Sequence, residues 1–150
     1  MFIVPIQVQW LHLDPNNHVR HSAYFDFGAY ARIALFDSVG LNRSALKHHR
    51  LGPILFREEA LFKREILFGD TIECHVCLYK ASRDYSKWGF RHDLIKRDGT
   101  LTATVFSDGA FMDIDIRKLT HLPDEFIEKM DTVTKSDNFH WIEKSQKTQN

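Results

Sequence analysis

The side chains best suited to chemistry in this sequence lie close together, near its N-terminus. Asp14 stands in a polar segment, residues 14–17, whose Asp, Pro and Asn residues favour a turn. His18 and His21 follow shortly after it. A carboxylate held in a turn can act as a nucleophile or as a general base, and a histidine can transfer protons. Without further information, Asp14 is more typical of an ordinary turn residue or a helix cap than of a catalytic group.

Two groups of residues raise the question of a metal or redox site. Three histidines surround Asp14, but their spacing in a loop matches no common zinc pattern, and we expect no metal. These histidines are His12, His18 and His21. Cys74 and Cys77 form a C-x-x-C pattern inside a segment that is typical of a strand. Residues three apart on a strand point to opposite faces and cannot share a metal, so we predict two buried apolar positions.

The composition excludes several classes of protein. Twenty Lys and Arg balance twenty Asp and Glu, so the chain lacks the excess of positive charge that nucleic-acid binding needs. A hydrophobic content of 43% excludes a disordered chain, and no apolar run approaches the roughly 20 residues of a membrane-spanning helix. The first residues lack the pattern of a secretory signal, and two cysteines form no disulfide framework. We therefore expect a cytoplasmic protein without a membrane span.

The elements that must position Asp14 follow from the hydrophobic pattern. We expect a helix over residues 22–39 that ends at Gly40. Because it is apolar nearly all round, it must be buried on most sides. A polar linker follows, and residues 124–130 suit a short helix. The expected strands are residues 2–10, 53–63, 71–82, 87–96 and 100–115. This order predicts an α+β fold in which one antiparallel sheet curls around one helix.

The same hydrophobic pattern predicts where the domain ends and that copies of the chain associate. We predict one domain over residues 1–130 and a polar C-terminal tail, residues 131–150, in which Phe139, Trp141 and Ile142 are able to dock. One sheet wrapped around one helix leaves an open edge, so pairing of two sheets in a homodimer or homotetramer is the economical solution.

Taken together, these residues resemble the hotdog-fold acyl-CoA thioesterases of the 4-hydroxybenzoyl-CoA thioesterase type. The resemblance covers about residues 3–128 and is most specific between Val8 and Arg32. The residues that carry it are Val8-Gln9-Trp10, Asp14-Pro15, His18-Val19, His21, Tyr24, Ala31-Arg32, Gly52-Pro53-Ile54, residues 66–70 and residues 122–125. The resemblance implies a hotdog fold, in which a five-stranded antiparallel sheet wraps a long central helix, and hydrolysis of an acyl-CoA substrate to free acid and CoA.

The resemblance also implies roles for individual residues. Asp14 would attack the thioester carbonyl or activate water, and His21 would supply a backbone N–H to the oxyanion and, as in some relatives, an imidazole that assists. His18, Tyr24 and Asn17 would contact substrate, although Tyr24 is also typical of a core aromatic residue. No metal and no cofactor beyond the CoA of the substrate is implied. Several Lys and Arg residues could meet the CoA phosphates, and the sequence does not choose among them.

Three departures from the family keep other functions open. Asn16-Asn17 stand where many relatives carry small residues, Arg20 stands where relatives often carry Asn, and the mid-helix segment 28–30 lacks the carboxylate of some hotdog families. Catalysis therefore rests on Asp14 or is absent. The alternatives are a non-catalytic acyl-thioester binding protein and a hotdog dehydratase or hydratase, which needs a histidine and an acid placed differently around the helix. The sequence does not reveal the acyl group.

Overall fold

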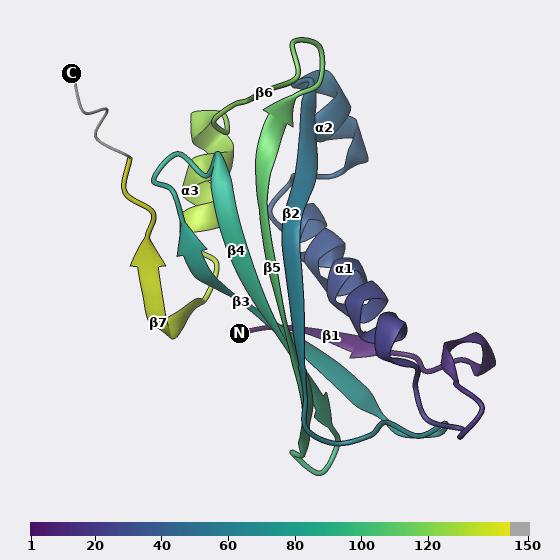
Figure 1. The fold of residues 1–150 in the computed structure, drawn as a ribbon. Coiled ribbons are helices and arrows are strands. Elements are labelled where there is room, and N and C mark those ends of the chain that lie inside the picture. The colour runs from purple at the N-terminus through teal and green to yellow at the C-terminus, as the bar shows by residue number, and fades with distance from the viewer. Residues whose placement is uncertain (145–150) are drawn as a thin grey trace, which may run out of the picture.

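A curled sheet and one long helix dominate the computed structural model, which describes residues 1–144 (Figure 1). The order of the main strands across the sheet is β1-β3-β4-β5-β2, and all neighbours on this path are antiparallel. Two more strands extend it, since β6 pairs with β5 and β7 pairs with β3. The strands are β1 (Phe2–Ile6), β2 (Leu51–Phe62), β3 (Ile72–Ala81), β4 (Lys87–Lys96), β5 (Leu101–Asp113), β6 (Lys118–Leu119) and β7 (Lys135–Trp141).

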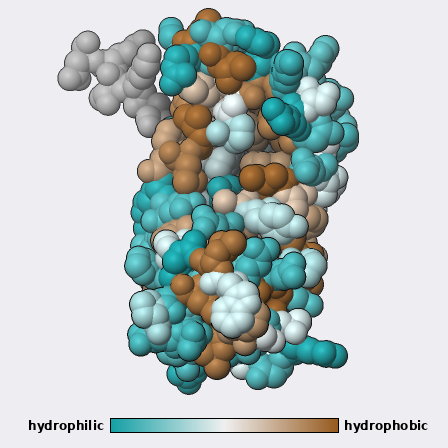
Figure 2. Space-filling model, turned by 90° about the vertical axis from the view of Figure 1, so that its right-hand side faces the viewer, coloured by the Kyte–Doolittle hydropathy of each residue, from teal (hydrophilic) through white to brown (hydrophobic). Residues whose placement is uncertain are grey.

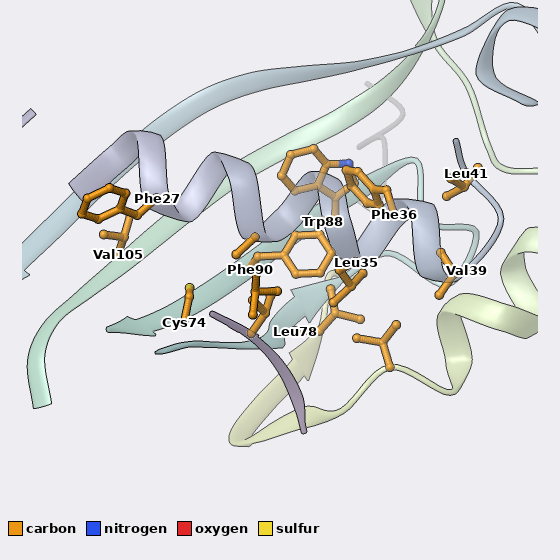
Figure 3. Packing of buried hydrophobic residues seen from close by; sticks show 14 of the residues in the cluster. Phe27, Leu35, Phe36, Val39, Leu41, Cys74, Leu78, Trp88, Phe90 and Val105 are labelled. Atoms are coloured by element: carbon orange, nitrogen blue, oxygen red, sulfur yellow. The ribbon is translucent and has the colours of Figure 1, made fainter. Parts of the chain in front are cut away.

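Helix α1 (His21–Ser38) lies against one face of this sheet, and burial there explains most of its apolar sequence, although Tyr30 and Ile33 are exposed. Figure 3 shows Phe27, Leu35 and Phe36 among side chains of the sheet. The Phe36 ring lies 5.8 Å from that of Trp88 and 5.6 Å from that of Phe90, edge to face in both pairs. Aromatic pairs in this geometry add to the stability that burial itself supplies. The α+β class, with a helix held inside a curled antiparallel sheet, is confirmed.

The segments on either side of α1 differ from the sequence-based prediction. The first strand ends at Ile6 rather than at residue 10, because Trp10–His12 turn into a short 3₁₀ helix, η1. The expected polar linker contains a second helix, α2 (Arg43–His48), whose N-cap Asn42 accepts a hydrogen bond from the Ala45 N–H at 2.9 Å. A helix this short and polar carries no apolar periodicity, which is why the pattern did not indicate it.

The polar C-terminal part of the chain, which the sequence indicated as a tail, adds a strand to the sheet. After α3 (Asp124–Asp131), β7 adds to the sheet parallel to β3. The Trp141 ring meets Tyr85 at 6.2 Å and the Arg83 guanidinium at 4.4 Å. The sheet therefore has two short strands beyond the five that were predicted. Residues 145–150 of the predicted tail lie outside the described residues.

Two further observations concern the whole described chain. Cys74 and Cys77 are both free and buried in β3, as predicted. None of the helices in residues 1–144 combines the length and the apolar character that crossing a membrane requires.

Candidate active site

Asp14 lies in a turn that its own side chain organises. Its Oδ1 accepts hydrogen bonds from the backbone N–H groups of Asn16, at 2.9 Å, and His18, at 3.1 Å. The Asp14 backbone closes the same turn, since its N–H donates to the His18 carbonyl at 2.8 Å. Asn17 takes the left-handed conformation, with φ of 59°, which asparagine adopts more readily than most residues. Across residues 1–144 no hydrogen bond engages the second carboxylate oxygen, Oδ2.

Hydrogen bonds tie the turn to the segment between β2 and β3 and to η1. The Val19 N–H donates to the Ile66 carbonyl at 2.8 Å, which joins the turn to the segment between β2 and β3. The Arg20 N–H donates to the His12 carbonyl at 2.8 Å, and the Arg20 guanidinium donates to the Leu11 carbonyl. Asp14 is therefore held between two fixed segments rather than on a free loop.

Helix α1 begins directly after the turn and leaves donors unused. Arg20, the residue before the helix, is extended and supplies no side-chain cap. Among the hydrogen bonds of residues 1–144, none uses the backbone N–H of His21 or of Ser22. The first N–H groups of a helix carry partial positive charge and lack partners within the helix. The start of α1 can therefore stabilise an oxyanion close to Asp14.

The other residues predicted for the site differ in their exposure. The side chain of His21 is exposed at the first turn of α1, Asn17 is exposed in the turn, and His18 is half-buried. Tyr24 is only 3% exposed, and its ring packs edge-on against Phe62 at 5.0 Å. Burial raises the pKa of Tyr24, and the negative charges of Glu65 and Asp14 act in the same direction.

A cavity of about 810 Å³ opens beside this turn. Its walls come from residues 5–9, from His12, from the Asp26, Phe27 and Tyr30 side of α1, and from residues 68–71. None of the five residues that the sequence indicated lines it. The sequence did not indicate the cavity, because its walls come from segments far apart in the chain. In Figure 2, hydrophobic side chains gather along the middle of the face on which α1 lies.

His12 links the cavity to the turn. Its Nδ1 accepts the Gln9 backbone N–H at 2.9 Å, so the neutral ring carries its proton on Nε2. Burial lowers the pKa of His12, and the nearby Arg20 lowers it further. His12 is thus a neutral hydrogen-bond donor in the cavity lining at neutral pH. Within residues 1–144, no three His, Cys, Asp or Glu side chains converge as metal ligands would.

A second polar cluster lies between α1 and the sheet. His92 is fully buried, and its Nδ1–H donates to the Val105 carbonyl at 3.0 Å. Nε2 of His92, Nη1 of Arg32 and the indole N–H of Trp88 are buried without a partner among the described residues. Burial lowers the pKa of His92 to about 4, and the Arg32 charge adds to this effect.

Comparisons with known proteins define the class. Hypothetical protein SAV2348 from Staphylococcus aureus, solved in complex with CoA, is 19% identical; the match covers 91% of this chain and 90% of that chain, with a TM-score of 0.82. The 1,4-dihydroxy-2-naphthoyl-CoA thioesterase Slr0204 from Synechocystis is 15% identical, over 87% of this chain and 96% of that chain, with a TM-score of 0.78. A DHNA-CoA thioesterase from Staphylococcus aureus is 16% identical, over 80% and 79% of the two chains, with a TM-score of 0.72. At these identities the likeness shows a shared fold, which is the hotdog fold.

The sequence carries the assignment one step further. A family model described as the thioesterase-like superfamily matches residues 8–130, and the chain belongs to that superfamily. No curated protein sequence matches the chain significantly.

Proposed function

We propose that this protein hydrolyses an acyl-CoA thioester to a free acid and CoA. The observation that supports this most directly is the Asp14 turn, which holds one carboxylate oxygen by two backbone N–H groups and leaves the other without a partner among the described residues. The unused N–H groups of His21 and Ser22 open α1, a few residues further along the chain. Membership of the thioesterase-like superfamily is consistent with this chemistry.

The reaction has two routes with the same balance. In one, Oδ2 of Asp14 attacks the thioester carbonyl, CoA leaves as the thiolate and takes up a proton, and water then hydrolyses the mixed anhydride. In the other, Asp14 takes a proton from water while that water attacks the carbonyl, and the tetrahedral intermediate then expels CoA, which takes up that proton and leaves as the thiol. In both, the backbone N–H of His21 binds the developing oxyanion, and its exposed imidazole is free to assist. Asn17, His18 and Tyr24 would contact the substrate around this centre. Neither route uses a metal or a further cofactor.

A second copy of the chain would complete the site. Strand β2 forms one edge of the sheet, and the side chains of Leu55, Phe56, Leu61 and Phe62 on it are exposed. An exposed apolar edge strand favours pairing with another strand. Two copies joined along β2 would give a homodimer with a continuous sheet, and two such dimers would give the homotetramer.

The test is the release of CoA thiol from a panel of acyl-CoAs by wild type, Asp14→Asn and Asp14→Ala. Asparagine keeps the oxygen that accepts the Asn16 and His18 N–H groups but removes the reactive carboxylate, whereas alanine removes both. We expect kcat/KM to fall at least a hundredfold, about 2.7 kcal/mol, in both variants. Thermal unfolding should separate the two, since only alanine loses the turn, at a cost of about 1 kcal/mol. Turnover by Asp14→Asn at the wild-type rate would overturn the mechanism.

The placement of the cavity favours a second candidate, an acyl-thioester binding protein without turnover. Asp14 does not line the cavity, so a ligand could occupy it without approaching the carboxylate. If calorimetry shows saturable binding of an acyl-CoA and the thiol assay shows no release of CoA from the same compound, the protein binds acyl thioesters without hydrolysing them.

A further inference from the structure

We infer that Arg20 is a positioning residue for the proposed reaction. Its guanidinium fixes the Asp14 turn against the start of α1 and so sets the distance between the carboxylate and the free N–H groups of the helix. This inference rests on the proposed hydrolysis and adds a residue to it. Arg20 acts through the segments that it joins and takes no part in the chemical steps.

The Asp14 turn is the loop of a small antiparallel hairpin, in which Leu13 pairs with Val19. At the open end of this hairpin, the Arg20 N–H donates to the His12 carbonyl at 2.8 Å. Arg20 is therefore the last residue of the hairpin and also the residue directly before α1. These backbone bonds hold the two arms of the hairpin together, but they leave open the direction in which the helix departs from it.

The guanidinium of Arg20 supplies contacts that fix this direction. Nη1 donates to the Leu11 carbonyl in η1, Nε donates to Ser22 Oγ at 3.0 Å, and Nη2 lies 3.7 Å from the Asp26 carboxylate. The first partner precedes the Asp14 turn, and the other two lie four residues apart on one face of α1. Only 32% of the Arg20 side chain is exposed. Because a guanidinium is planar and rigid, contacts in three directions fix the angle between η1 and the helix.

Arg20 also leaves the first N–H groups of α1 open to an anion. The preferred residues at this position, such as serine and asparagine, carry a side-chain oxygen that accepts an N–H of the first turn. An arginine side chain has donors alone, so it cannot cap the helix. The N–H groups of His21 and Ser22 have no partner among residues 1–144. Arg20 thus joins the helix to η1 by its side chain without occupying the donors that an oxyanion needs.

The proposed reaction is sensitive to this arrangement because two groups must meet one thioester carbonyl. The attacking oxygen must stand about 3–3.5 Å from the carbonyl carbon, and the N–H donors about 2.7–3.1 Å from the oxyanion. A displacement of about 1 Å can lower the rate about a hundredfold. Asp14 precedes Arg20 in the chain and His21 follows it, so a change in the angle at Arg20 moves one group relative to the other.

The first experiment measures kcat and KM of wild type, Arg20→Lys and Arg20→Asn on an acyl-CoA that the wild type hydrolyses. Lysine keeps the positive charge but replaces the rigid fork by one flexible ammonium group, whereas asparagine removes the three contacts and is able to cap the helix. We expect kcat to fall at least tenfold in both variants and KM to stay within threefold. Arg43→Lys and Arg43→Asn, at an exposed arginine that begins α2, are the matched controls and should keep the wild-type kcat.

Thermal unfolding of each variant separates positioning from stability. The rates are compared at a temperature at which all the proteins are fully folded, so that a fall in kcat does not come from unfolded enzyme. A wild-type kcat in Arg20→Lys would overturn the inference, because the fork would then be dispensable. A rise in KM with kcat unchanged would overturn it as well, since it would place Arg20 in substrate binding.

The second experiment needs no turnover and measures amide hydrogen exchange by NMR in wild type and Arg20→Lys. The N–H groups of His12 and Leu13 close η1, which the guanidinium holds through the Leu11 carbonyl. We expect these two amides to exchange at least fivefold faster in the variant. The Val19 N–H, which is bonded to the segment before β3, is the internal reference and should not change. Unchanged exchange at both amides of η1 would refute the inference.

The two experiments distinguish this inference from the proposed function. Turnover that requires Asp14 but is the same in both Arg20 variants leaves hydrolysis standing and removes the role of Arg20. A wild type that hydrolyses no acyl-CoA removes the proposed function, and the exchange rates then decide whether Arg20 fixes the hairpin against α1.

Discussion

His92 should make the stability of the folded protein depend on pH in a narrow acidic window. Burial lowers its pKa from 6.5 to about 4, so the folded protein holds the ring neutral while the unfolded chain protonates it near pH 6.5. The stability that comes from the neutral His92 ring is fully present above the pKa of His92 in the unfolded chain. It is lost as the pH falls toward the pKa of His92 in the folded protein. The pKa difference of about 2.5 units, at 1.36 kcal/mol per unit, sets the loss at about 3 kcal/mol.

The groups that face His92 explain the size and sign of this effect. Arg32 from α1 opposes a second positive charge, whereas the Val105 carbonyl on β5 and the Asp93 charge on β4 act the other way. Desolvation is the largest cause, because the ring is fully buried between α1 and the sheet. The opposing groups are too weak to restore the normal pKa.

The assay is urea unfolding of wild type and His92→Asn at a series of pH values. The asparagine amide can still donate to the Val105 carbonyl but does not titrate. The difference in unfolding free energy between the two proteins should change by about 1.4 kcal/mol per pH unit between about pH 6.5 and about pH 4. His48→Asn, at an exposed residue, should follow wild type. Parallel curves for wild type and His92→Asn would refute the reasoning.

Two further predictions concern packing in the sheet. A Cβ added at Gly109 would overlap the Ile54 carbonyl and the Trp88 ring, so Gly109→Ala should lower the free energy of unfolding by about 2 kcal/mol or more, measured by urea denaturation. An unchanged midpoint would show that β5 can move away at little cost. Burial raises the pKa of Cys74 to about 12 and also raises that of Cys77, so neither thiol should react with Ellman's reagent until the protein unfolds. Rapid modification of the native protein would contradict their burial.

Features encoded within a single segment could be predicted from the sequence. The long helix was predicted as residues 22–39 and runs over His21–Ser38, because its apolar surface and the following Gly40, with φ of 85°, mark it locally. Strand β4 matches its predicted bounds, 87–96, and the hairpin after it contains Gly99 in the left-handed conformation that a tight turn requires.

Features that depend on distant partners could not be predicted. Strand β7 is polar and gains its place from pairing with β3, so no alternation in its own sequence indicates it. The cavity joins β1, α1 and the segment before β3, and only the folded chain brings these together. Tyr24 gives a further example, since the edge-on packing of its ring against Phe62 on β2 joins residues far apart in the sequence.

The Asn16-Asn17 pair, the clearest departure from the family, fits the proposed role of Asp14. Small residues at these positions would leave the turn free to take several conformations. Here Asn17 holds the left-handed conformation, and the Asn16 and His18 N–H groups fix Oδ1 of Asp14. When hydrogen bonds hold one carboxylate oxygen, the orientation of the whole group is fixed and the second oxygen stays available. A nucleophile or base that must approach the thioester from a defined direction needs this arrangement. Asn16 and Asn17 therefore hold the proposed catalytic carboxylate of Asp14 in place and do not argue against its role.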